Sequence, residues 1–193
     1  SDPDGVKGKA AQTVTVATRP EPKAFDGGRK LHVYPPDFKG KKEEPSFVSV
    51  MEAYYGPGKG LWHSAKIQPG DIILVHAGTY KSDRLKYYEP LGLHFHGVYQ
   101  LSKNGTPDKP IVIRGAGDGE AVFDGGGVYR LFDVMFADNT YIEGITIKNC
   151  EVGIYAGLRY TRGCSGLVVR NCRFENVGCA VNAQYGGCRN FYI

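Results

Sequence analysis

The chain has 193 residues, the length of a single domain with room for a substantial core. Its 24 basic and 20 acidic residues give a net charge of +4, far from the dense cationic stripe of a nucleic-acid-binding protein. Its apolar runs are much shorter than the roughly 18 residues that a membrane-spanning helix needs. Composition therefore predicts neither nucleic acid as a partner nor a membrane span.

Residues 1–44 are mostly polar and are predicted to form an N-terminal extension that ends in a charged loop. Residues 45–55 follow with apolar side chains at helical spacing, and Ser46 could cap the helix while Gly56-Pro57 ends it. The sequence therefore predicts an amphipathic helix over 45–55. The apolar residues that define its face are Phe47, Val50, Met51 and Tyr54.

A long insertion is predicted at 81–100, after a turn–strand–turn pattern at 69–80. Its aromatic and cationic side chains suit a sugar chain that bears carboxylates or sulfates, and loops of this kind often carry function. His94 and His96 would point the same way on a strand, where they could bind a metal with a third ligand, contact substrate or pack within the loop. The predicted substrate-binding residues are Arg84, Lys86, Tyr87, Tyr88, His94 and His96.

Short strands without intervening helices follow at 110–114, 121–125 and 131–134. Asp124 and Asp133 lie at or near their ends, where an Asp is favoured for backbone reasons and where it could also bind calcium. Calcium at Asp124 and Asp133 is therefore one hypothesis, and an ordinary bend is the other.

A repeat organises residues 141–181. The alternating segment 141–149 matches 168–176 at an offset of 27, and a third copy begins at Cys188 with an offset of 24. Apolar alternations that return at this spacing, with Gly and Asn at the bends, are typical of the coils of a β-solenoid. The amphipathic helix would then cover the open first coil.

The same offset pairs side chains on neighbouring strands. It places Glu143 beside Arg170 and Lys148 beside Glu175, which predicts cross-strand ion pairs rather than catalytic groups. Asn149 would likewise stack on Asn176 at a bend. The five cysteines are predicted to be buried thiols, with a disulfide between Cys164 and Cys188 as the alternative.

Several segments together resemble the opening coils of pectin lyase-like right-handed parallel β-helix proteins. They are Pro69-Gly-Asp with Ala77-Gly-Thr-Tyr80, Pro110-Ile-Val-Ile-Arg-Gly115, Asp124-Gly-Gly-Gly127 and Thr140–Asn149. The resemblance covers about residues 46–193. It implies an all-β fold, a right-handed parallel β-helix in which 45–193 form a capping helix and the first coils.

The resemblance also implies a function. It points to a secreted carbohydrate-active protein, at an extracellular, cell-surface or periplasmic location, and to a polysaccharide lyase that cleaves an acidic, uronate-containing polysaccharide by β-elimination. A non-catalytic glycan-binding or structural protein and a glycoside hydrolase are the alternatives. Because Ile193 falls in the middle of an expected strand, the chain is expected to continue, with its catalytic residues on later coils.

Overall fold

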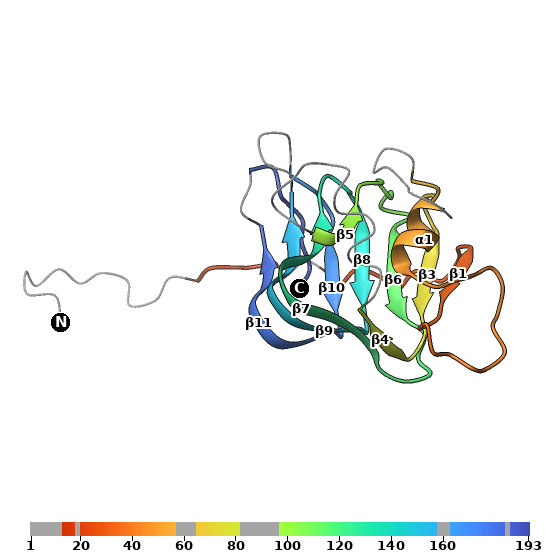
Figure 1. Cartoon of the computed structure of the whole chain (residues 1–193). Coiled ribbons are helices and arrows are strands. Elements are labelled where there is room, and N and C mark those ends of the chain that lie inside the picture. Colours follow the sequence, from red (N-terminus) through yellow and green to blue (C-terminus); the bar gives the residue numbers. More distant parts are fainter. Residues whose placement is uncertain (1–12, 18–19, 57–64, 82–96, 158–162, 184–185) are drawn as a thin grey trace, which may run out of the picture.

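The computed structural model describes residues 13–17, 20–56, 65–81, 97–157, 163–183 and 186–193. Within these ranges the chain forms two mostly parallel sheets and one short helix (Figure 1). Sheet A has six strands in the order β10-β8-β6-β3-β1-β2. Sheet B has the order β11-β9-β7-β4, and β5 also pairs with β7.

The strands of sheet A are β1 (Lys30–Val33), β2 (Ser46–Phe47), β3 (Ile72–Val75), β6 (Ile111–Gly115), β8 (Thr140–Glu143) and β10 (Val168–Arg170). The strands of sheet B are β4 (Gly78–Tyr80), β5 (Gly97–Leu101), β7 (Ala121–Val134), β9 (Thr146–Ala156) and β11 (Arg173–Asn182).

The strand register agrees with the repeat in the sequence. Glu143 on β8 pairs with Arg170 on β10, and Lys148 on β9 pairs with Glu175 on β11, both at the predicted offset of 27. An isolated parallel bridge joins Val168 to Tyr192, at the predicted offset of 24. The prediction of which residues lie side by side is therefore confirmed at these positions.

The overall architecture differs from the predicted one. Among the described residues the strands make two sheets with little helix, and they do not define the closed coils of a solenoid. Sheet A also extends past β3 into β1 and β2, which lie in segments predicted as an extension and a helix. The predicted right-handed parallel β-helix with a capping helix was therefore wrong, and the fold is corrected to two mostly parallel sheets. Alternating apolar residues specify how strands pair, but they do not specify how the intervening segments close a coil.

The helix is shorter than predicted. Helix α1 spans Val50–Tyr55, and its N-cap is Ser49, whose side chain accepts a hydrogen bond of 3.0 Å from the Glu52 backbone N–H. The predicted cap, Ser46, instead pairs with His32 as part of β2. Gly56 ends the helix with φ of 90°, a conformation that glycine adopts without a steric penalty.

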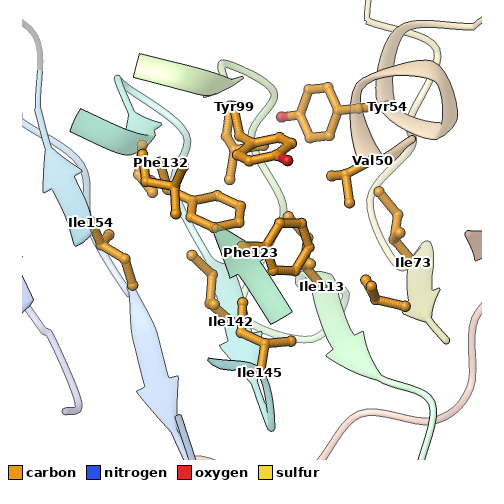
Figure 2. Packing of buried hydrophobic residues seen from close by; sticks show 14 of the residues in the cluster. Val50, Tyr54, Ile73, Tyr99, Ile113, Phe123, Phe132, Ile142, Ile145 and Ile154 are labelled. Carbon is orange, nitrogen blue, oxygen red and sulfur yellow. The ribbon is translucent and has the colours of Figure 1, made fainter. Parts of the chain in front are cut away.

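The core lies between the two sheets and extends to α1 (Figure 2). Sheet A contributes inward-facing aliphatic side chains such as Ile73, Ile113 and Ile142, all fully buried. Sheet B contributes Phe123 and Phe132, whose ring centroids lie 5.2 Å apart in an edge-to-face arrangement. This apolar packing fixes which residues of sheet A point outward, because side chains alternate along a strand.

Candidate functional site

The outer face of sheet A carries two rows of side chains that cross its strands. One row is apolar and forms a second cluster, in which Phe25 from the N-terminal region is partly buried. The strand register aligns the other row two residues further along each strand. The apolar row consists of Ile72, Val112, Tyr141 and Val168. The second row consists of His32, Leu74, Arg114, Glu143 and Arg170.

Glu143 lies at the centre of a charged ladder in that second row. Its Oε2 atom accepts a hydrogen bond of 2.6 Å from Arg114 Nε, and its Oε1 atom forms an ion pair of 2.6 Å with Arg170 Nη2. Only 6% of the Glu143 side chain is exposed. A carboxylate this buried needs charged partners, and the two guanidinium groups supply them from both neighbouring strands.

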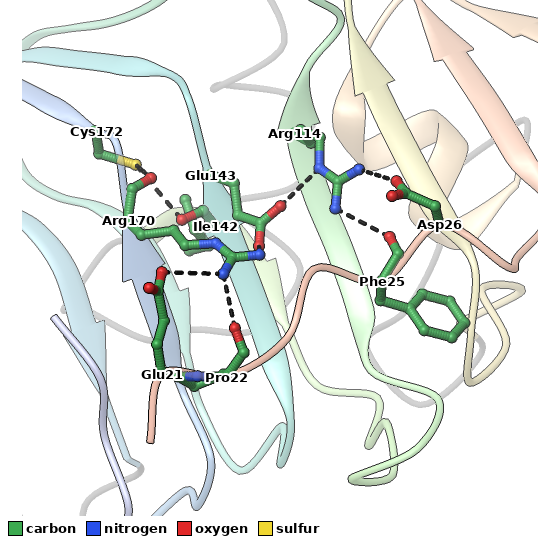
Figure 3. Close-up of polar contacts among 9 residues, drawn as sticks. All are labelled: Glu21, Pro22, Phe25, Asp26, Arg114, Ile142, Glu143, Arg170 and Cys172. Carbon is green, nitrogen blue, oxygen red and sulfur yellow. Dashed lines mark hydrogen bonds and ion pairs between the residues drawn. The ribbon is translucent and has the colours of Figure 1, made fainter. Parts of the chain in front are cut away.

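The N-terminal segment 20–29, here called the strap, lies across this ladder (Figure 3). Arg114 donates a hydrogen bond of 2.9 Å to the Phe25 carbonyl oxygen and pairs with Asp26. Arg170 donates one of 2.8 Å to the Pro22 carbonyl oxygen and lies 3.5 Å from Glu21 Oε1. The two guanidinium groups thus bind an extended chain through carboxylate and carbonyl oxygens.

The strap is fastened at its C-terminal end. Arg29 Nη2 and Nε lie 2.6 Å and 3.1 Å from the two carboxylate oxygens of Asp71, a bidentate pair. The Phe25 side chain packs against the apolar row. The carboxylates of Glu21 and Asp26 are well exposed, at 62% and 72%, so water competes for them. The strap therefore has a firm end at Arg29 and weaker contacts over the ladder.

The charge of the ladder depends on the strap. Without the strap, two guanidinium groups surround one carboxylate and the ladder carries one net positive charge. With the strap in place, Glu21 and Asp26 add two negative charges. Partial burial lowers the pKa of Arg114, but its hydrogen bonds to Asp26 and Glu143 outweigh this effect and leave the pKa raised. The ladder is therefore a cationic site that the chain's own carboxylates occupy.

The predicted substrate-binding residues cannot be placed by this structure. Arg84, Lys86, Tyr87, Tyr88, His94 and His96 lie outside the described residues. Their assignment to substrate binding stays a prediction.

The two aspartates predicted to bind calcium lie at different positions along β7, and calcium binding stays a prediction. Asp124 pairs with Lys148 of β9, whereas Asp133 pairs with Tyr155 further along that strand. Asp124 Oδ1 accepts a hydrogen bond of 2.9 Å from Asn149 Nδ2, and Asp124 Oδ2 lies 3.0 Å from Lys81 Nζ.

These contacts account for the titration of Asp124. The Asn149 hydrogen bond, together with Lys81 and against the effect of burial, lowers the pKa of Asp124 to about 2. Asp133 lies 3.6 Å from Arg130 Nη1. Across the described ranges, no group of three or more His, Cys, Asp or Glu side chains converges as a metal site.

All five cysteines are free thiols, but the prediction that they are buried holds only for Cys150 and Cys164, because Cys172, Cys179 and Cys188 are half-buried. Cys164 and Cys188 lie side by side without a disulfide, and burial, followed by the neighbouring Cys188, raises the pKa of Cys164 to about 12. Thiols with a raised pKa are poor nucleophiles at neutral pH. Cys164 therefore contributes to packing rather than to a reactive site.

A groove of about 490 Å³ lies at the bend shared by β7, β9 and β11. Asn176 Nδ2 donates a hydrogen bond of 2.9 Å to Asn149 Oδ1 at its edge, which confirms the predicted stacking of these amides. Both residues have positive φ, which Asn tolerates at bends. Asn149 accepts from Asn176 and donates to Asp124, so its amide is already engaged in the bend, and the groove offers less chemistry than the face of sheet A.

Sequence reasoning anticipated the Glu143–Arg170 pair but not the strap or the place of Arg114. The available signal was the cluster of Glu21, Asp26 and Arg29, which carries opposite charges close together in a segment with no periodicity. Such a segment gives no register, so its charges could not be assigned to partners.

Comparisons with known proteins give no family for this chain. No family model, curated protein or solved structure matches it. The resemblance to pectin lyase-like proteins thus stays a prediction. No helix in the described part of the chain is long and apolar enough to cross a membrane.

Proposed function

We propose that this protein binds an acidic, uronate-containing polysaccharide along the outer face of sheet A. The observation that carries the proposal is the contact between the strap and the charged ladder, where Arg114 and Arg170 hold carboxylate and carbonyl oxygens of an extended chain. A uronate polymer presents the same oxygen types along an extended backbone. The planar guanidinium fork suits such oxygens better than a lysine would.

The dimensions of the face fit a polymer rather than a small molecule. Arg114 and Arg170 are separated by β8, so their backbones lie two strand spacings, roughly 10 Å, apart. The apolar row runs beside them and includes the aromatic ring of Tyr141. Aromatic rings provide packing surface for the apolar faces of sugars, while the arginines provide charge-assisted hydrogen bonds.

The ladder could instead serve only to stabilise sheet A. Against this, each arginine forms an ion pair with Glu143 through one side of its guanidinium group and directs the other side toward the strap. Ion pairs to carboxylates as exposed as Glu21 and Asp26 contribute roughly 0–1 kcal/mol to stability. A polymer with many carboxylates can therefore displace those contacts at small cost.

In its more specific form, the proposal is that the protein is a polysaccharide lyase that acts by β-elimination. A secreted location would bring the protein to such a polymer. A non-catalytic glycan-binding protein would use the same face. A glycoside hydrolase gains less support from this site, because both oxygens of the buried Glu143 carboxylate already lie 2.6 Å from arginine nitrogens.

Affinity electrophoresis in gels that contain polygalacturonate, alginate or neutral dextran tests the proposal. The triple variant Arg114→Gln/Glu143→Gln/Arg170→Gln removes the ladder's charges together and so avoids leaving one charge buried alone. We expect the wild type to be retarded by the acidic polymers and not by dextran, and the triple variant to lose at least about tenfold in affinity, roughly 1.4 kcal/mol.

Arg173→Gln is the matched control. Arg173 begins β11 on sheet B, and its side chain is 66% exposed. The variant Arg173→Gln loses one positive charge, as each Arg→Gln substitution in the ladder does. We expect it to bind acidic polymers like the wild type. Equal retardation of the triple variant and the wild type would overturn the proposal.

A further inference from the structure

A hydrogen-bonded chain of acid–base groups lies at the opposite end of the same face. His32 Nδ1 lies 3.0 Å from His76 Nε2, and His76 Nδ1 lies 2.6 Å from Asp118 Oδ2. Both imidazoles are buried, with His32 6% and His76 8% exposed. The three side chains come from β1, from the residue after β3 and from the turn after β6, so the sheet brings together groups more than 40 positions apart.

The hydrogen bonds have a defined direction of donation, from His32 to His76 and from His76 to Asp118. A carboxylate can only accept, so His76 Nδ1 carries the proton that is donated to Asp118. In neutral His76 the Nε2 atom is then the acceptor, and His32 Nδ1 donates to it. His32 Nε2 is left as a basic nitrogen at the end of the chain. In known acid–base sites a carboxylate orients the imidazole that it binds, and here the same orientation is passed from His76 to His32 by the hydrogen bond between them.

Two tyrosines, Tyr34 and Tyr80, hold the hydrogen-bonded histidines in place. The Tyr34 ring stacks on His76 with centroids 4.0 Å apart and an interplanar angle of 11°. The single hydroxyl proton of Tyr80 is shared between the backbone carbonyls of Val33 and His76, at 3.0 Å and 2.8 Å. Both imidazoles thus have fixed orientations, as positioned acid–base groups require.

Among the described residues, Glu43 and Lys42 place charges beside the cluster. Glu43 Oε2 lies 3.9 Å from His32 Nε2, and its side chain is 74% exposed. Lys42 lies over the Tyr34 ring at 5.7 Å. Burial raises the pKa of Asp118, but its hydrogen bonds with His76 and with the Ala77 backbone N–H outweigh this effect and leave the pKa lowered. Asp118 is therefore ionised at neutral pH. At the other end of the hydrogen-bonded series His32 Nε2 faces Glu43, although the His32 side chain is only 7% exposed.

We infer that His32 is the base of a β-elimination on the polymer bound to this face, with His76 and Asp118 as its positioning residues. The inference rests on the proposed binding function. His32 belongs to the same row as Arg114, two strand spacings or roughly 10 Å away, with only Leu74 between them. A uronate carboxylate held by Arg114 would bring the neighbouring C5–H toward His32.

The step balances without any further reactant. The C5 proton moves to His32 Nε2, the C–H electron pair forms the C4=C5 double bond, and the C4–O bond breaks. The departing glycosidic oxygen takes a proton from water, and the proton on His32 neutralises the resulting hydroxide. Arg114 stabilises the negative charge that develops on the carboxylate during proton removal. Exposed Glu43 is the side chain that must move aside to admit the sugar.

The test uses the full chain with polygalacturonate and alginate, and it follows the ultraviolet absorbance of unsaturated uronate ends. We expect the wild type to form them and His32→Gln to lose at least about 100-fold in rate, the typical contribution of a general base. Added imidazole should restore part of the rate to His32→Ala. Arg173→Gln, on sheet B, should match the wild type.

The variant Asp118→Asn distinguishes an acid–base role of the cluster from a purely structural role. Asp118 is 43% exposed at its side chain, so this variant is expected to fold, and its pH–rate profile should shift because the tautomer of His76 is no longer fixed. A wild type that binds polyuronate but forms no unsaturated ends overturns the inference and leaves the binding proposal intact. So does an unchanged rate in His32→Gln or an unshifted pH profile in Asp118→Asn. Absence of binding in the gels is the separate failure of the binding proposal.

Discussion

The outer faces of the two sheets carry the same kind of charge ladder and use it differently. On sheet A, Glu143 is 6% exposed and lies between Arg114 and Arg170 under the strap. On sheet B, Arg173 pairs with Glu175 and lies 3.6 Å from Glu120, but these three side chains are between 39% and 66% exposed. Burial, rather than the presence of a pair, distinguishes a candidate site from a solvated surface.

The largest expected effect is on folding stability. Glu143→Ala leaves two partly buried guanidinium groups without their shared carboxylate, and we expect it to lower the free energy of unfolding by about 3 kcal/mol. Glu175→Ala on sheet B should cost at most about 0.5 kcal/mol. Urea denaturation of both variants measures the difference. Equal losses would show that the two ladders are equivalent after all.

A pH dependence separates Asp124, a buried carboxylate of sheet B, from the ladder. The folded-state pKa of Asp124 is about 2, below its ordinary value of 3.8, so its ionised form stabilises the fold above pH 3.8. That contribution is lost as the pH falls from 3.8 through 2, and it amounts to at most about 2 kcal/mol.

The variant Asp124→Asn tests this assignment. We expect its unfolding midpoint to be less sensitive to acid over that window than the wild-type midpoint. Thermal unfolding followed by circular dichroism at several pH values compares them. A wild type and a variant with parallel pH profiles would mean that other carboxylates dominate the acid response.

The third expected effect concerns the strap. If Glu21 and Asp26 occupy the ladder in place of a polymer, then Glu21→Gln/Asp26→Asn should bind polygalacturonate about fivefold more tightly, roughly 1 kcal/mol. The matched control is Glu120→Gln/Glu175→Gln, which removes two carboxylates near Arg173 on sheet B. Calorimetric titration measures both. Equal gains in the two variants would indicate a general charge effect rather than release of the ladder.

The same comparison explains what the sequence could predict. Glu143 and Arg170 were paired correctly because β8 and β10 lie inside the 27-residue repeat. Arg114 was missed because it lies 29 positions before Glu143, outside that repeat. The strap has no alternating pattern, and His32 and His76 are 44 positions apart with no repeat to relate them. A local pattern predicts neighbours on adjacent strands, whereas contacts made by irregular segments depend on the folded surface.

The fold prediction failed for a related reason. The repeat gives strand pairing, and two sheets satisfy it without a closed solenoid being defined by the described residues. The helix began later than expected because Phe47 pairs with Val33 in β2, so Ser49 becomes the cap. Apolar spacing at i, i+3 and i+4 could not distinguish a two-residue strand from a first helical turn.

The smallest expected effect is the loss of the exposed ion pairs of sheet B. Arg173→Gln removes the central cation of the sheet B ladder, yet its partners Glu120 and Glu175 are solvated and keep their hydration when it is lost. We expect the free energy of unfolding to change by less than about 0.5 kcal/mol. Urea denaturation at low and high salt checks this value, and any loss should shrink at high salt because exposed pairs are screened. A loss above about 1 kcal/mol that persists in salt would mean that sheet B, like sheet A, holds a desolvated charge.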